Sequence, residues 1–307
     1  MTEKAVMVGL GEVLWDLLPS GKVLGGAPTN FAYMASVLGD EGVVASRVGS
    51  DRMGHEAQQQ LQRLGLSTSH LQRDSEYPTG TAGVSIDAAG QPTFVIGESV
   101  AWDYLQWTSE WEKLAAQAEV ICFGSLAQRA QASFETIDRF LCHSRRDALR
   151  IFDVNLRQSF YSAEVLRRSL EHANIVKLTE QELAVIAASL GLKGANEKSL
   201  ARSLIREYRL KLVCITRGAQ GSLLVSKGEC IGHPGVAVKV VDAVGAGDAF
   251  TACLAHHFVR GHSLGEIGGY ANRFASWVAT QVGATPVIKR FQVQQLLQNA
   301  GAAESSG

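Results

Sequence analysis

Short runs of Val, Ile and Leu alternate with longer stretches in which apolar residues recur every three or four positions. The short runs predict strands and the longer stretches predict helices. Strands are expected at 5–10, 43–48, 120–123, 150–154, 175–178, 212–216 and 222–226, and helices at 52–64, 163–172, 180–190, 198–208, 247–260 and 264–281. Strands that alternate with helices imply a parallel sheet covered on both faces.

Two segments break this alternation. Residues 13–24 surround the turn-forming Pro19-Ser20-Gly21, and residues 81–96 surround a second turn at 87–90. Their alternating polar and apolar residues predict hairpins with one face in water. A small second sheet is therefore expected beside the main one.

The composition is that of a globular enzyme. The chain has 307 residues, of which 46% are hydrophobic and 19% charged, with a formal net charge of -1. Such a chain buries a large core, and no linker, repeat or low-complexity run divides it. We expect one domain over 1–307, with a flexible tail at 299–307.

Several partners are excluded at this stage. The near-neutral charge gives no electrostatic footprint for nucleic acid or an anionic membrane. No apolar run reaches the roughly 18 to 20 residues that span a bilayer, and residues 1–4 lack the layout of a signal peptide. The five cysteines, an odd number without C-x-x-C spacing, are expected to be reduced. These features predict a cytoplasmic protein that binds neither nucleic acid nor membrane.

One glycine-rich segment carries a clear chemical signal. A strand is expected over 236–241, followed by Asp242-Ala-Val-Gly-Ala-Gly-Asp248 and a helix. The backbone N–H groups of Gly245, Ala246 and Gly247 would be unpaired donors at the helix start, where a phosphate binds well. Asp248 in the same turn would accept a proton from an alcohol. The alternative is an ordinary glycine-rich helix start.

A second glycine-rich segment is Gly25-Gly26-Ala-Pro28-Thr-Asn30, in which the glycines end a strand and Pro28 opens a helix through about Leu38. Together the two segments resemble the paired signatures of the ribokinase-like (PfkB) carbohydrate kinases, most closely the bacterial fructokinases. Ala243 departs from the Thr, Ser or Pro usual there. The similarity extends from Gly9-Leu-Gly-Glu12 to Gly283-Ala284.

This resemblance implies a ribokinase-like three-layer α/β/α sandwich with a mostly parallel central sheet and a small β-sheet lid. The lid would come from insertions at about 12–27 and 78–104. In the family it closes over the sugar, and in several members it contributes to a dimer contact. Monomer and homodimer both remain open.

The resemblance also implies the catalytic roles. Asp248 would take the proton of a sugar hydroxyl while the turn Gly245–Gly247 stabilises developing charge. Arg157, in Asp153-Val-Asn155-Leu-Arg157, would neutralise the moving phosphoryl group, or it would make a surface ion pair. The expected sugar contacts are Asp16, Gly25, Gly26, Asn30, Trp102, Asp103, Asn155 and Asp248 itself. Trp102 has an alternative role, in the packed face of the lid.

The nucleotide is expected to bind without a Walker A loop, because Gly21-Lys22 is followed by Val23. The resemblance places ATP against Lys177, Thr216, Gly218, Gly221, Gly245, Gly247, Asn272 and Ser276. Asn272 and Ser276 share a helix face and have an alternative role in packing around Phe274 and Trp277.

Two acidic residues are candidates for ion contacts. Glu182 would hold Mg²⁺ through water, although Thr179 replaces the Asn of the family's Asn-x-x-Glu motif. Its alternative role is that of a first-turn helix acid. Asp242 is the candidate for a monovalent cation such as K⁺.

Fructose, phosphorylated at its 6-hydroxyl, is the first choice of substrate, because ribokinases tend to carry Lys where this chain has Pro28. Ribose and 2-keto-3-deoxygluconate are the alternatives. An acidic sugar would want a cation in the lid, and no Arg or Lys lies at 24–46 or 79–110. A non-catalytic sugar sensor is the alternative of another class.

Overall fold

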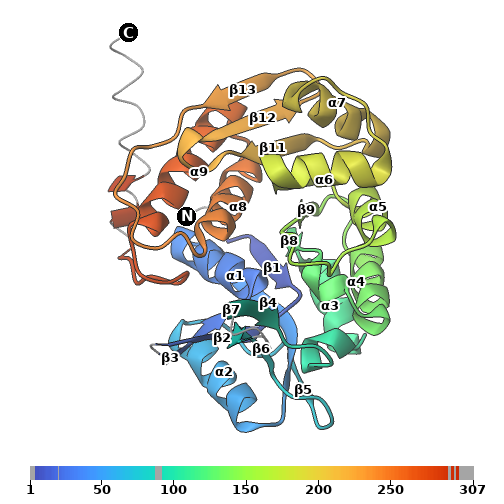
Figure 1. Cartoon of the computed structure of the whole chain (residues 1–307), viewed down its shortest axis with the longest axis vertical. Helices are drawn as coiled ribbons and strands as arrows, with labels where there is room; N and C mark the ends of the chain where they lie inside the picture. The colour runs from blue at the N-terminus through green and yellow to red at the C-terminus, as the bar shows by residue number, and fades with distance from the viewer. Residues whose placement is uncertain (1–3, 20, 87–91, 290–291, 294, 297–307) are drawn as a thin grey trace.

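A computed structural model describes residues 4–19, 21–86, 92–289, 292–293 and 295–296. Its central feature, within those residues, is a nine-stranded sheet of order β13-β12-β11-β10-β9-β8-β1-β4-β5 (Figure 1). The parallel strands are β1 (Val6–Leu10), β4 (Glu41–Gly49), β5 (Leu71–Asp74), β8 (Val120–Phe123), β9 (Leu149–Asp153), β10 (Ile175–Thr179) and β11 (Leu212–Thr216). The antiparallel β12 (Ser222–Ser226) and β13 (Cys230–His233) complete one edge.

Helices cover both faces of this sheet (Figure 1). One layer holds α1 (Ala27–Leu38), α2 (Arg52–Arg63), α8 (Ala246–Phe258) and α9 (Leu264–Ala279), and the other holds α3 (Ser109–Gln117), α4 (Gln131–His143), α5 (Ala163–His172), α6 (Glu180–Leu190) and α7 (Glu197–Tyr208). Successive strand residues point to opposite faces. On β8, Val120 and Cys122 therefore pack with the first layer, and Ile121 and Phe123 with the second.

A second, four-stranded sheet has the order β3-β2-β6-β7. Its strands are β2 (Leu14–Leu18), β3 (Gly21–Gly25), β6 (Gly80–Ile86) and β7 (Pro92–Ile96). The hairpin pairs are antiparallel, and β2 pairs with β6 in parallel, so both predicted insertions contribute to one sheet. Short 3-10 helices occupy Ala101–Tyr104 (η1), Leu126–Gln128 (η2) and Gly218–Gln220 (η3). The expected second turn at 87–90, Ser20 and the expected tail at 299–307 lie outside the described residues.

The predicted fold class is confirmed, and most predicted elements agree with the structure to within two residues. The strand expected at 236–241 is wrong, since the segment pairs with no strand. Val241 and Asp242 instead donate their N–H groups to the carbonyl of Ala279, at 2.8 and 3.2 Å. Val240 is 59% exposed, so its side chain has no layer to pack against. None of the described helices is long and apolar enough to cross a membrane.

Candidate active site

The candidate active site lies where several strands of the central sheet end. The carboxyl ends of parallel strands are where open α/β sheets bind ligands. Glu12 follows β1, Asp153 ends β9 and Thr179 ends β10. The starts of α1 and α8 lie beside these ends, since a Cβ on Gly26 would lie 2.4 Å from the carbonyl of Glu12 and a Cβ on Gly247 would lie 2.9 Å from Nζ of Lys177, on β10.

The turn before α8 is built for close approach. Gly245, the N-cap of this helix, has φ 78°, in the left-handed region that favours glycine. A Cβ there would lie 2.5 Å from the Cβ of Ala284, so a side chain is excluded as well. No side chain caps the helix. The expectation of three unpaired donors needs one correction, since the N–H of Ala246 donates to the carbonyl of Ala243 at 3.3 Å.

Asp248 lies in the first turn of α8 and is half-buried. Its Oδ2 accepts a hydrogen bond from Nδ2 of Asn30 at 2.7 Å, which joins α8 to α1. Burial, reinforced by the charge of Asp153, raises the pKa of Asp248 to about 6, against the opposing effects of Asn30, Lys177 and Arg157. The carboxylate is therefore mostly ionised at neutral pH and basic enough to accept a proton.

Glu12 is a second carboxyl at this site, and no role for it was predicted from the sequence. It is 3% exposed, and burial raises its pKa to about 7, with a further contribution from the charge of Asp248. Oε1 accepts from the N–H of Ala27 at 3.3 Å, while Oε2 has no hydrogen-bond partner. The buried Oγ1 of Thr29 and Oδ1 of Asn30 also lack partners. Buried polar atoms without partners are costly, so this cluster is suited to a hydroxyl-rich ligand or to ordered water.

A buried ion pair lies beneath the turn. Nζ of Lys177 lies 3.0 Å from Oδ1 of Asp153, and Oγ1 of Thr251 donates to Oδ2 of Asp153 at 2.8 Å. Burial alone would lower the pKa of Lys177, but the carboxylates of Asp153, Asp248 and Glu182 outweigh it and raise the pKa. A Cβ on Gly247 would lie 2.9 Å from Nζ of Lys177, so the ammonium reaches the helix start.

The comparisons with known proteins agree with this geometry. The model of the pfkB family of carbohydrate kinases matches residues 20–290. The chain belongs to this family. It is 30% identical to a fructokinase of Escherichia coli over 259 residues, covering 80% of this chain and 81% of the relative, and 32% identical to one of Salmonella typhimurium over 257 residues, with the same two coverages.

Solved structures are also similar. An uncharacterized sugar kinase of Pyrococcus horikoshii matches with a TM-score of 0.81 and 26% identity, covering 96% of this chain and 99% of the other. A Vibrio cholerae fructokinase bound to fructose, ADP and potassium ion matches with a TM-score of 0.79 and 25% identity, covering 96% and 98%. The protein is thus a carbohydrate kinase of the ribokinase fold.

The predicted sugar-side residues Arg157, Asn155 and Asp16 differ in exposure and in their effect on the carboxylates of the site. Arg157 is exposed, and its charge stabilises the ionised forms of Asp16, Glu12 and Asp248. Asn155, just before it, has φ 43°, a left-handed conformation that turns the chain after β9. Burial raises the pKa of Asp16, which is partly exposed on β2.

Neighbouring site residues leave no room for a side chain at either glycine of the second motif. A Cβ on Gly25 would lie 2.3 Å from Oδ2 of Asp16, and one on Gly26 would lie 2.4 Å from the carbonyl of Glu12. Gly26 also has φ 107°. The pair therefore lets the chain pass close to two carboxyl-bearing residues.

Trp102 and Asp103, both predicted to contact the sugar, are buried and packed against Arg129 in this structure. Trp102 is 0% exposed, and the guanidinium of Arg129 lies 4.0 Å above its ring. Asp103 accepts two hydrogen bonds from Arg129, both at 2.8 Å, and is 3% exposed. Both carboxylate oxygens of Asp103 accept from Arg129, whereas Nε1 of Trp102 is buried without a hydrogen-bond partner. Arg129 was missed because nothing in the local sequence shows a partner 26 positions away.

The nucleotide-side residues follow β11 and lie in α9. Gly221 has φ 85°, and a Cβ there would lie 2.1 Å from the carbonyl of His233. Gly218, with φ 55°, begins η3, and Thr216, the last residue of β11, donates to the carbonyl of Leu178 at 3.4 Å. Asn272 is buried and donates to Ser222 and Gly268, both at 2.7 Å, which favours packing. The remaining candidate, Ser276, is partly exposed.

Glu182 and Asp242, the two residues predicted to contact ions, accept hydrogen bonds from backbone N–H groups. Glu182 accepts from the N–H groups of Leu156 at 2.8 Å and Thr179 at 2.7 Å, and it forms a capping box with Thr179. Asp242 accepts from the N–H groups of Val244 at 2.9 Å and Gly283 at 3.0 Å. Each carboxylate oxygen keeps a lone pair. The ion contacts therefore stay predictions.

Proposed function

We propose that this carbohydrate kinase transfers the γ-phosphoryl group of ATP to the 6-hydroxyl of fructose, giving fructose 6-phosphate and ADP in the cytoplasm. The observation that carries the proposal is the position of Asp248. A carboxylate with a pKa of about 6 lies in the first turn of a helix that no side chain caps. Base and anion-binding groups are therefore adjacent, as phosphoryl transfer to an alcohol requires.

The proton and the phosphoryl group move in opposite directions. Asp248 accepts the proton of the sugar hydroxyl as that oxygen bonds to the γ-phosphorus and the bond to the ADP oxygen breaks. The N–H groups at the start of α8 and the ammonium of Lys177 stabilise the charge on the phosphoryl oxygens. Arg157, exposed at the same opening, neutralises the charge from the sugar side.

Two partly exposed carboxylates, those of Glu182 and Asp242, offer the oxygen ligands that a hard cation prefers. Glu182 is the residue that would hold Mg²⁺ through water, and bound Mg²⁺ would offset phosphate charge. Asp242 would hold the backbone around a K⁺ site. This second role is supported by the potassium ion in the Vibrio cholerae fructokinase structure.

A neutral sugar fits this chain better than an acidic one. Lys22, on the four-stranded sheet, forms an ion pair with Glu56, and Arg129, which packs against η1, is neutralised by Asp103. A sugar carboxylate would compete with the phosphoryl group for Arg157. The fructokinase names of several relatives at 26–32% identity further support fructose.

The lid would also provide the contact of a homodimer, should the protein be one. Leu17, Leu18, Val23 and Val95 on the four-stranded sheet are between 40% and 48% exposed. Leu17 and Val95 lie on one face of this sheet and Leu18 and Val23 on the other, and exposed apolar side chains are suited to a protein contact. A monomer would leave them in water.

A coupled ADP-release assay with Mg-ATP tests the function against fructose, ribose, 2-keto-3-deoxygluconate, glucose, tagatose and a riboside. The riboside is included because an aminoimidazole riboside kinase of Salmonella enterica is also similar, with 25% identity and a TM-score of 0.77. We expect the highest kcat/KM with fructose. A higher value for another sugar would replace fructose, and binding without turnover across the panel would favour a sugar sensor.

A further inference from the structure

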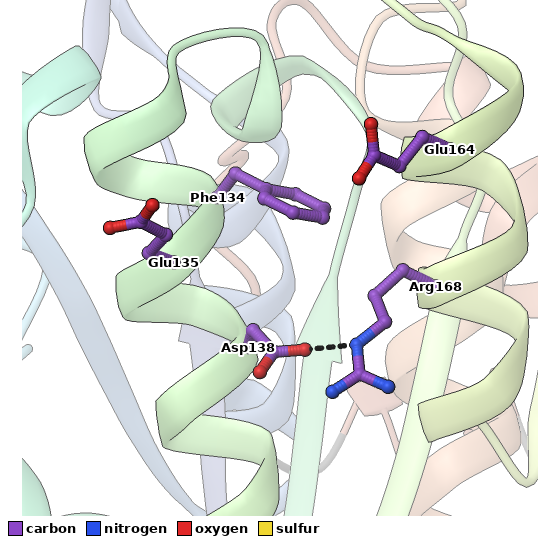
Figure 2. Close-up of a pocket in the computed structure, with 5 residues that line it drawn as sticks. All are labelled: Phe134, Glu135, Asp138, Glu164 and Arg168. Atoms are coloured by element: carbon purple, nitrogen blue, oxygen red, sulfur yellow. Dashed lines mark hydrogen bonds and ion pairs between the residues drawn. The ribbon is translucent and has the colours of Figure 1, made fainter.

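Helices α4 and α5 face each other along a groove on the outer layer. Asp138 and Arg168 point toward each other across it (Figure 2). The groove holds a cavity of about 220 Å³ lined by Phe134, Glu135, Asp138, Glu164 and Arg168. Residues four apart share one helix face. The residues one turn beyond Asp138 and Arg168 are therefore Cys142 and His172, on the same two faces.

Asp138, Cys142 and His172 form a compact donor set. Nε2 of His172 lies 2.7 Å from Oδ1 of Asp138, and Sγ of Cys142 lies 4.0 Å from Oδ2 of Asp138. One ligand atom from each of the three residues lies within 4.8 Å of the others. Bonds of about 2.0 to 2.3 Å to a tetrahedral Zn²⁺ would place such atoms roughly 3.3 to 3.8 Å apart. Small side-chain rotations bring the set to that spacing.

We propose that Asp138, Cys142 and His172 bind a thiophilic divalent cation of the Zn²⁺ class, with water in the fourth position. Sulfur, imidazole nitrogen and a single carboxylate favour Zn²⁺ over Mg²⁺, which prefers oxygen ligands. Cys142 is exposed, so the cation reaches the thiol directly from solvent. The site is therefore chemically distinct from the Mg²⁺ contact expected near the phosphates.

The charges around the set permit a cation. On binding, the thiol of Cys142 loses its proton, so the thiolate and the carboxylate together offset the two positive charges of the metal. Arg168 is bonded to Asp138, but it also contacts Glu171 at 3.2 Å and keeps that partner if Asp138 turns to the metal. Arg150, near Cys142, donates to the carbonyl of His172 at 2.7 Å, which fixes the end of α5.

The site lies away from the reaction. Cys142 and His172 are in the last turns of α4 and α5, and both helices run back from the carboxyl ends of the preceding strands. The cluster therefore lies near the amino ends of the parallel strands, whereas Asp248 lies near their carboxyl ends. A cation there would join α4 to α5 and stabilise the fold without entering phosphoryl transfer.

Titration of the full-length protein with Co²⁺ tests this site, because a thiolate bound to Co²⁺ gives a charge-transfer absorption that oxygen ligands do not. We expect one equivalent of Co²⁺ to produce this absorption, Zn²⁺ to abolish it, and binding to weaken from pH 8 to pH 6 as the thiol regains its proton. Cys142→Ser should remove the absorption, and His172→Gln should weaken binding at least tenfold.

Cys230→Ser is the matched control, since Cys230 is a partly exposed thiol on β13, outside the donor set. It should bind Co²⁺ as the unmodified protein does. Circular dichroism checks that each variant is folded. Absence of the absorption in the unmodified protein, or its persistence in Cys142→Ser, would overturn the proposal.

Discussion

Replacing Lys177 by Met would leave Asp153 as an unpaired charge in the core. The lysine and aspartate side chains are only 8% and 5% exposed, and their charged atoms lie 3.0 Å apart. Methionine fills a similar volume but cannot donate a hydrogen bond. The hydroxyl of Thr251 would remain the only described side-chain donor to that carboxylate. We therefore expect a large loss of stability.

Breaking a buried pair by removing one partner costs about 3–5 kcal/mol. With an m-value of about 3 kcal/mol/M, the urea midpoint should fall by roughly 1 to 1.7 M. Burial already raises the pKa of Asp153 above its ordinary 3.8, and loss of the ammonium raises it further. A carboxyl with a raised folded-state pKa loses stability as the pH rises through that pKa, so the deficit should shrink toward acidic pH.

Two variants make this reasoning refutable in urea unfolding at pH 7. Lys211→Met removes an exposed lysine and should change stability by less than about 0.5 kcal/mol. Lys177→Met combined with Asp153→Asn removes the stranded charge and should be more stable than Lys177→Met alone. A loss below about 1 kcal/mol in Lys177→Met would refute the account of the buried pair, as would a double variant less stable than the single one.

Three further outcomes follow from the site. Protonation of Asp248 should lower kcat/KM about tenfold per pH unit below about pH 6, so a flat profile from pH 5 to 7 would count against it as the base. Gly247→Ala should displace the ammonium of Lys177 and lower kcat about 10²-fold, whereas Gly228→Ala, with nothing within 4 Å, should keep its rate in the same assay. Arg129→Leu should destabilise the protein by about 3–5 kcal/mol in urea unfolding, and an unchanged midpoint would deny its role in bracing η1.

The strands and helices could be predicted well because burial leaves a periodic record in the sequence. The predicted helices 163–172 and 180–190 coincide with α5 and α6. The failure at 236–241 has a physical cause. Closely spaced valines also suit an extended loop, and the periodicity cannot show whether a neighbouring strand receives the backbone hydrogen bonds.

The candidate site was predictable only where one segment carries the chemistry. The turn at 245–248 can be recognised from the local sequence, because two glycines and a carboxylate lie within four residues. The partners of Asp153, Lys177 and Thr251, are 24 and 98 positions away from it. Asp103 and its partner Arg129 are 26 positions apart. Such pairs depend on how the strands are ordered, so the sequence suggested a sugar contact for Asp103 where the structure has a buried ion pair.

The most direct test of the central claim is the single-turnover rate of phosphoryl transfer from ATP to fructose in Asp248→Asn and in the unmodified protein. Asparagine keeps the size of the side chain but cannot accept the proton. We expect unchanged ATP binding and a rate lowered by about 10² to 10⁴-fold. A variant that binds ATP and still transfers the phosphoryl group at the unmodified rate would contradict the assignment of Asp248 as the base.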